Sequence, residues 1–252
     1  MATIAGQILN AFLYLAYIRR FKSIKLEKES FRISGKVMAK VSSLGISSFI
    51  TQIAIVLVMA VTNNILVSYG AQSKYGAEIP LTTIGITMKV NQIVSAVLLG
   101  LATGAQPIFG YNYGSGQKDR VKKAYRIIVT ASTVMLILAF FVFQFAPMSI
   151  VRLFGSESEM YNEFAVKCFR IFLLACPING LQMATGIFFQ AIGKPTQATV
   201  LSLSRQIVYL LPATVLLPMA LGVEGALWAG PLADVLAFIT TLAMLKLYWK
   251  KI

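Results

Sequence analysis

The chain has 252 residues, of which 57% are hydrophobic and 13% are charged, and its formal net charge at pH 7 is +14. Soluble domains average about 45–50% apolar and about 25% charged residues, so this composition argues against a soluble globular protein and favours an integral membrane protein. Histidine, the commonest general base and metal ligand, is absent. We therefore expect no enzymatic activity, no catalytic residues, no metal site and no cofactor.

The apolar segments predict an all-α integral membrane protein. The first segment, residues 2–18, is short, and it is unlike a signal peptide because no basic residue precedes it while Arg19 and Arg20 follow it. A helix needs roughly 20 apolar residues to cross the hydrocarbon core of a bilayer. Six segments reach this length and predict a six-transmembrane-helix bundle, at 44–69, 80–109, 125–145, 161–190, 196–219 and 223–247.

The connectors between these segments alternate in charge. The connectors at 19–43 and 110–126 and the C-terminus are rich in lysine and arginine, whereas the connector at 154–163 is acidic. Basic loops stay in the cytoplasm, so the pattern places the basic connectors and the C-terminus inside the cell. It predicts that Ser115 lies inside and Ser156 outside. The excess of positive charge then reflects topology and anionic lipid rather than nucleic acid.

The stretch GYNYGSGQK, residues 110–118, is rich enough in glycine to raise the question of a phosphate-binding loop. A P-loop requires G-x-x-x-x-G-K-[ST] between a strand and a helix, but this stretch lacks the final Gly-Lys-Ser/Thr and follows an apolar segment. We interpret it as a turn between two membrane helices. Glycine permits tight turns with positive φ, and the basic residues that follow anchor the next helix at the inner face.

Three stretches carry a resemblance to a known family. GLATGAQPIFGYNYGSGQKDRV (100–121) resembles the eighth helix and following loop of multidrug and toxic compound extrusion (MATE) transporters. IFFQAIGKPTQATVLSLSRQIVYLLP (187–212) resembles the junction of their tenth and eleventh helices, and GVEGALWAGPLADVLA (222–237) resembles their twelfth helix. The resemblance extends over nearly the whole chain.

The resemblance implies three parts. Residues 1–18 are expected to end helix six of the family, residues 19–43 to form a basic cytoplasmic linker, and residues 44–252 to form the six-helix C-terminal lobe. The loop charges place the N-terminus outside with no segment before the first helix, which suggests part of a longer protein whose N-terminal lobe is missing.

The resemblance also implies a function. MATE transporters are secondary active antiporters in which two bundles rock against each other, and they export organic cations and other amphipathic drugs in exchange for protons or sodium ions. This chain is expected to be part of such a transporter in the plasma membrane, and to be inactive without the N-terminal lobe. Two alternatives remain: a flippase for lipid-linked precursors with a related fold, and an inert membrane fragment.

Asp234 is the one acid deep within a predicted span, and an ionisable group there is a functional hypothesis by default. The hypothesis is that it couples transport to protons or cations; the alternative is that it only ties helices together. Lys89 can bind or repel charge in a cavity, pair with an acid such as Asp234, or extend to the interface. Arg170 and Arg205, nearer the ends of their segments, are interpreted as anchors.

Amide side chains within the spans either join helices or line a cavity. The candidates for substrate or ion coupling are Gln52, Asn91, Gln92, Asn179 and Gln182, and the spans also contain Asn63 and Asn64. Sodium-coupled members of the family carry acids in the seventh and tenth helices of this lobe. The matching regions here contain Gln52 and Asn179 but no acid, which argues against a sodium site of that type.

Overall fold

The computed structural model describes residues 2–19, 34–155 and 158–249, and these residues form helices joined by turns, with no strand among them. The chain divides into two compact units, Met1–Ser43 and Leu44–Ile252. In the first unit, α1 (Ala2–Arg19) is a single helix. Most of the expected basic linker, and Ser156 in the acidic connector, lie outside the described residues.

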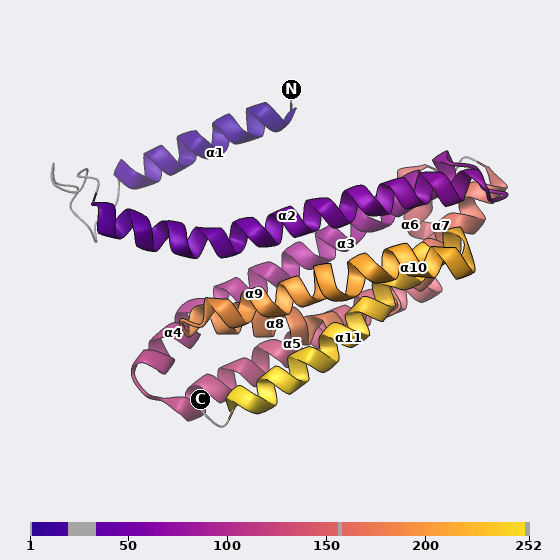
Figure 1. Cartoon of the computed structure of the whole chain (residues 1–252). Coiled ribbons are helices and arrows are strands. Elements are labelled where there is room, and N and C mark those ends of the chain that lie inside the picture. The colour runs from indigo at the N-terminus through magenta and orange to yellow at the C-terminus, as the bar shows by residue number, and fades with distance from the viewer. Residues whose placement is uncertain (1, 20–33, 156–157, 250–252) are drawn as a thin grey trace. The chain divides into compact units, whose positions relative to one another are not determined.

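The second unit contains the predicted membrane helices (Figure 1). It includes the later part of α2 (Gly35–Ala71) and all of the helices that follow. Five helical segments of the described chain are long and apolar enough to cross a membrane: Phe49–Ala71 in α2, Glu78–Gly114 (α3, Glu78–Gly104, with α4, Gln106–Gly114), Lys118–Phe145 (α5), Pro195–Leu221 (α9, Pro195–Leu203, with η2, Ser204–Leu210, and α10, Leu211–Leu221) and Val223–Trp249 (α11).

The remaining predicted crossing, 161–190, is broken rather than straight. Its two halves are α7 (Glu159–Phe172) and α8 (Cys176–Ala191), which meet at an angle of 50°. The short helix α6 (Pro147–Phe154) precedes them. The all-α architecture and the set of apolar segments expected from the sequence are confirmed, and the bend within 161–190 is the main departure.

Proline marks where several of these helices begin. Pro107, Pro147 and Pro177 each lie in the first turn of a helix, where the missing backbone N–H would have no partner within the helix anyway. Pro107 follows the break between α3 and α4, and Pro177 follows the break between α7 and α8. Pro231 instead lies inside α11. The breaks between α3 and α4 and between α7 and α8 therefore each lie next to a proline that can be identified in the sequence.

Aromatic side chains fill the core of the second unit. Phe109, Phe188 and Phe189 are completely buried together with Tyr125, in a cluster that joins α4, α5 and α8 to the end of α11. The rings of Phe109 and Phe188 meet edge to face with centroids 5.3 Å apart, a favoured geometry for aromatic pairs. Further clusters join α3 to α5 and α7, and α3 and α7 to the start of α11.

Close packing of α10 against α11 depends on glycine. These two helices lie side by side after a tight turn at Gly222, which has a φ of 62° (Figure 1). A Cβ atom on Gly225 would overlap the backbone carbonyl of Leu217 and would lie 2.6 Å from the nitrogen of Pro218. The backbone leaves no room for a side chain, so α11 can start directly against α10 only with glycine here.

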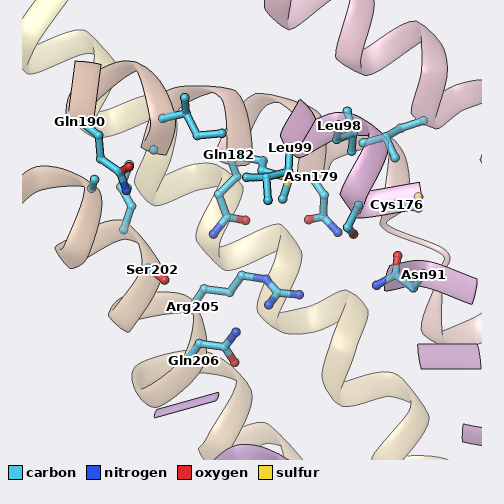
Figure 2. A pocket seen from close by; sticks show the side chains of 17 residues that line it. Asn91, Leu98, Leu99, Cys176, Asn179, Gln182, Gln190, Ser202, Arg205 and Gln206 are labelled. Atoms are coloured by element: carbon cyan, nitrogen blue, oxygen red, sulfur yellow. The ribbon is translucent and has the colours of Figure 1, made fainter. Parts of the chain in front are cut away.

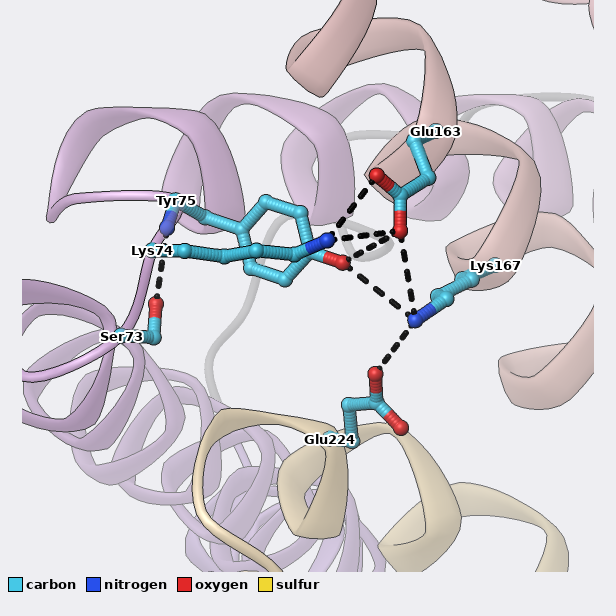
Figure 3. A network of polar contacts seen from close by, with 6 residues as sticks. All are labelled: Ser73, Lys74, Tyr75, Glu163, Lys167 and Glu224. Carbon is cyan, nitrogen blue, oxygen red and sulfur yellow. Dashed lines mark hydrogen bonds and ion pairs between the residues drawn. The ribbon is translucent and has the colours of Figure 1, made fainter.

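At one end of the second unit, charged side chains join the α2–α3 turn to α7 and α11 (Figure 3). Lys74 Nζ lies 3.1 Å from both carboxylate oxygens of Glu163, and Tyr75 donates a 2.9 Å hydrogen bond to the same carboxylate. Lys167 Nζ lies 2.6 Å from Glu224 Oε1 and 3.6 Å from Glu163 Oε1. We call Lys74, Tyr75, Glu163, Lys167 and Glu224 the terminal ionic network.

At the other end of α11, basic side chains cover aromatic rings. Lys194 Nζ lies 4.9 Å from the ring centroid of Tyr248, and Lys122 Nζ lies 5.9 Å from that of Trp249. The α4–α5 and α8–α9 turns therefore meet the C-terminal end of α11, whereas the α2–α3 turn meets its start. Connectors expected to share a side of the membrane come together, and which side faces the cytoplasm stays a prediction.

Candidate functional site

A cavity of about 400 Å³ lies between α3, α5, α8, α9 and η2 (Figure 2). Leu98, Leu99 and Met183 supply apolar surface, and polar side chains supply the rest. The polar members of the lining are Asn91, Ser95, Asn179, Gln182, Gln190, Ser202, Arg205 and Gln206. An apolar wall with a few convergent polar groups is the usual composition of a small-molecule site.

The polar stripe of α8 explains one wall of this cavity. Asn179, Gln182, Gly186 and Gln190 recur at three- and four-residue intervals, so they share a face of the helix. Phe188 and Phe189, between them in sequence, point into the aromatic core instead. The same helix thus contributes an apolar face to the core and an amide-bearing face to the cavity.

An ion pair lies at the edge of the cavity. Arg205 donates from Nε to Asp234 Oδ1 over 2.7 Å, and Arg205 Nη2 lies 2.7 Å from the same oxygen. Asn179 donates from Nδ2 to the other carboxylate oxygen, Oδ2, over 2.9 Å. We call Asn179, Arg205 and Asp234 the central triad; it joins α8, η2 and α11.

Burial separates the two charges of this pair. The Asp234 side chain is only 6% exposed, whereas that of Arg205 is 27% exposed and lines the cavity. Asp234 lines a smaller neighbouring cavity together with Asn91, Asn179 and Arg205. The guanidinium group therefore stands between the larger cavity and the carboxylate.

The interpretation of Arg205 as a helix-end anchor is wrong, because Arg205 is bound to Asp234 near the middle of a membrane-spanning segment. Pro195–Leu221 is one long crossing, and Arg205 lies in its π-helical part, η2. A π-helical turn shifts side chains out of the ordinary helical register and frequently occurs at functional sites.

The structure brings together some of the candidate residues. Asn91, Asn179 and Gln182 line the larger cavity, and Asp234 lies directly behind Arg205. Gln52, Lys89 and Gln92 are exposed and are not part of the lining. Within the described chain, the cation bound to Asp234 is Arg205, so of the alternatives for Lys89 the pairing with Asp234 is not present.

Sequence reasoning missed Arg205, Gln206, Gln190, Ser95 and Ser202. Two signals were available in the sequence. A buried carboxylate needs a counter-ion, and Arg205 is a basic residue inside an apolar segment. The second signal was the spacing of the amides on α8, which places Gln190 on the same face as Gln182.

The polar groups of the site are hydrogen-bonding groups that can bind a ligand. Asn179 Oδ1 is buried without a hydrogen-bond partner in the described part of the chain, although most buried acceptors have one. No group of three or more potential metal-ligating acids, cysteines or histidines occurs among residues 2–19, 34–155 and 158–249. The cavity thus offers amides, hydroxyls and one guanidinium.

A family model, MatE, matches residues 47–215 of the chain. The chain belongs to the MatE family. The resemblance to MATE transporters that the sequence indicated is therefore confirmed. The model match runs from the first crossing into the fifth and includes all seventeen residues that line the cavity.

Related proteins agree with this assignment. The chain is 23% identical over 237 residues to the multidrug export protein MepA of Staphylococcus haemolyticus, and the alignment covers 94% of this chain and 50% of that protein. It is 19% identical to MepA of Staphylococcus saprophyticus, covering 97% and 52%. This MatE chain thus spans about half the length of the curated relatives that it matches.

Solved structures show the same fold. An outward-facing multidrug resistance MATE transporter superimposes with a TM-score of 0.82 at 18% identity, over 98% of this chain and 54% of that one. The MATE multidrug transporter DinF-BH, solved in complex with R6G, superimposes with a TM-score of 0.76 at 30% identity, over 97% and 52%. The second unit has the architecture of one MATE lobe.

Proposed function

We propose that this chain forms the C-terminal lobe of a secondary active exporter of amphipathic drugs in the plasma membrane, with its C-terminus in the cytoplasm. The observation that carries the proposal is the cavity of mixed apolar and polar lining between helices of a single MatE lobe. A volume of about 400 Å³ lies within the range of small-molecule sites. The names of the MepA relatives support drug export.

Activity requires a second lobe. Alternating access between bundles depends on one bundle moving against another around a shared site. The described part of this chain contains five crossings, or six with the bent pair, and the relatives are about twice as long. We therefore propose that residues 1–252 alone bind substrate but do not export it, and that export is driven by a proton or sodium gradient in the whole transporter.

The central triad supports a structural role for Asp234 more than an ion-coupling role. A carboxylate that exchanges the coupling ion must release its partner, whereas Asp234 is bound by both Arg205 and Asn179. The sequence-based hypothesis that Asp234 couples transport remains a prediction. We propose instead that Asp234 balances the charge of Arg205 and that coupling depends on a carboxylate in the other lobe.

A chimaera tests the proposed function. The half of S. haemolyticus MepA that this chain matches is replaced by residues 1–252, and the chimaera is compared in liposomes with residues 1–252 alone. We expect gradient-driven extrusion of an amphipathic fluorescent dye from the chimaera and none from the chain alone. Extrusion by the chain alone would refute the need for a second lobe, and a folded chimaera without extrusion would refute the export function.

Charge-neutral variants of the chimaera test the role of Asp234. If the carboxylate only balances Arg205, then Asp234→Asn combined with Arg205→Gln retains dye extrusion under a proton or a sodium gradient. If Asp234 exchanges the coupling ion, extrusion is lost in Asp234→Asn and is not recovered in the double variant.

A further inference from the structure

We propose that the cavity of this lobe binds the anionic group of an amphipathic organic acid, such as a carboxylate or sulfonate, through the guanidinium of Arg205. The proposal rests on the proposed function in that the cavity is treated as a substrate site. It goes further by naming the charge of the bound group, which is opposite to that of an organic cation.

The charge of the lining carries the inference. The larger cavity is bounded by seventeen residues, and Arg205 is the one charged side chain among them. The remaining polar groups of the lining are amides and hydroxyls, with no carboxylate. A cationic ligand in this cavity would therefore meet a cation, whereas an anionic ligand would meet a donor-rich surface of favourable sign.

Asp234 does not cancel this preference, because of where it lies. Its carboxylate is 6% exposed and is bound through both oxygens, by Arg205 at Oδ1 and by Asn179 at Oδ2. Arg205 is 27% exposed and lines the larger cavity, whereas Asp234 is not part of that lining. The pair is thus a dipole whose positive end is the one that borders the cavity.

Arg205 also has donors to spare. A guanidinium group has five N–H donors, and the contacts with Asp234 involve Nε and Nη2. In the picture of the site, Arg205 extends from η2 toward α8, and the amides of Gln182 and Asn179 lie on the side of α8 that faces it (Figure 2). A planar anion can accept from the free edge of the guanidinium, as carboxylates and phosphates commonly do.

The rest of the cavity fits an amphipathic molecule. Leu98, Leu99 and Met183 offer an apolar wall for a hydrocarbon or aromatic body. Gln182 and Gln206 complete the polar surround.

Three probes of matched size test the sign of the charge. Purified residues 1–252 in phosphatidylcholine nanodiscs are titrated with 2-naphthoate (anion), 2-naphthamide (neutral) and 2-naphthylmethylammonium (cation), with empty nanodiscs as the blank. We expect naphthoate to bind about tenfold or more tighter than the ammonium, because a hydrogen bond to a charged group has that value.

Variants of the triad then separate charge from shape. Asp234→Asn leaves an unbalanced guanidinium and is expected to strengthen naphthoate binding by about tenfold. Arg205→Gln with Asp234→Asn keeps the triad neutral and hydrogen-bonded, so it retains the fold and is expected to reduce the discrimination between the three probes to about threefold or less. Lys89→Gln removes the same charge from an exposed site outside the lining and should change nothing.

Equal binding of the three probes, tighter binding of the ammonium, or an equal effect of Lys89→Gln would overturn the proposal. These outcomes are independent of export. If the nanodisc sample binds the anion but the chimaera is inactive, the proposed anion site stands and the proposed export function is refuted. If the chimaera is active but the lobe binds the ammonium more tightly, the export function stands and the anion site is refuted.

Discussion

Two ionic clusters in the same lobe differ in depth and in consequence. The central triad holds one carboxylate, 6% exposed, between an arginine and an amide in the middle of the bundle. The terminal ionic network links Lys74, Glu163, Lys167 and Glu224, whose side chains are 36–61% exposed, at the end of the bundle (Figure 3). Charges in the interior cannot be stabilised by water, so the triad must be complete, whereas the network is supported by solvent.

This difference in depth indicates different roles for the central triad and the terminal ionic network. The network has more ion pairs, but water and salt screen them, so each contributes little to stability. The triad has one pair, and its electrostatic effect extends into a cavity. The number of ion pairs is therefore a poor guide to which cluster affects the cavity.

The largest effect is expected in a labelling experiment that determines on which side of the membrane the terminal ionic network lies. Gln72, in the exposed turn that carries the network, and Ser115, in the basic α4–α5 turn, are each replaced by cysteine. In intact cells, an impermeant thiol reagent should label Gln72→Cys and not Ser115→Cys, because basic loops stay in the cytoplasm. The native Cys168 and Cys176 are buried and serve as the internal blank. Labelling of Ser115→Cys alone would reverse the orientation.

Disruption of the triad should give the largest change in stability. Arg205→Gln leaves the Asp234 carboxylate buried without its cation, and breaking a buried pair costs about 3–5 kcal/mol. Thermal unfolding in detergent, followed by tryptophan fluorescence, should show a large fall in Tm.

The matched double variant decides whether charge is the cause. Arg205→Gln with Asp234→Asn removes both charges and keeps polar groups of similar size, so most of the lost stability should return. If the double variant is as unstable as Arg205→Gln, then packing of the guanidinium, and not the ion pair, holds this part of the lobe together.

The triad also shows how far the sequence alone could lead. Asp234 was recognisable because a carboxylate in the middle of an apolar segment is costly and needs a reason. Its partner could be inferred only as some basic residue within an apolar segment; Arg205 was not singled out because it was placed near the end of its segment, and a π-helical turn such as η2 leaves no mark in hydrophobic periodicity. Which cation met the carboxylate depended on how distant helices pack, as the exposed position of Lys89 illustrates.

The fold was more predictable than the site. Membrane helices are defined by the length and polarity of local segments, so five crossings appeared where apolar stretches were found. The bend between α7 and α8 was signalled by Pro177 but could not be assigned an angle. The cavity draws its walls from α3, α5, α8, α9 and η2, and only tertiary packing brings these walls together.

A buried but uncharged pair gives an intermediate effect and tests whether depth alone matters. The hydroxyls of Tyr125 and Thr185, both buried, lie 2.7 Å apart between α5 and α8. Tyr125→Phe should cost about 1 kcal/mol, the typical net contribution of one hydrogen bond, because Thr185 still donates to the carbonyl of Leu181. Thermal unfolding under the same conditions measures it. A loss as large as that of Arg205→Gln would show that depth, rather than charge, sets the penalty.

The smallest effect is expected in the terminal ionic network. Lys167→Gln removes the contacts with Glu163 and Glu224, but these groups are exposed enough to be hydrated. We expect a loss of about 1 kcal/mol or less, vanishing in about 1 M salt, where the Debye length is about 3 Å.

The neighbouring lysine, Lys74, allows a test by pH. The Glu163 carboxylate raises the pKa of Lys74 above its ordinary value of 10.5, so Lys74 stays charged below pH 10.5 and loses its charge only as the pH rises through the raised pKa. Between pH 7 and 9 the contribution of Lys74 to the stability of wild-type protein should therefore be constant.

For Lys167→Gln, a fall in Tm that persists in high salt would show that the terminal ionic network is protected from water. The contrast between the two clusters would then fail.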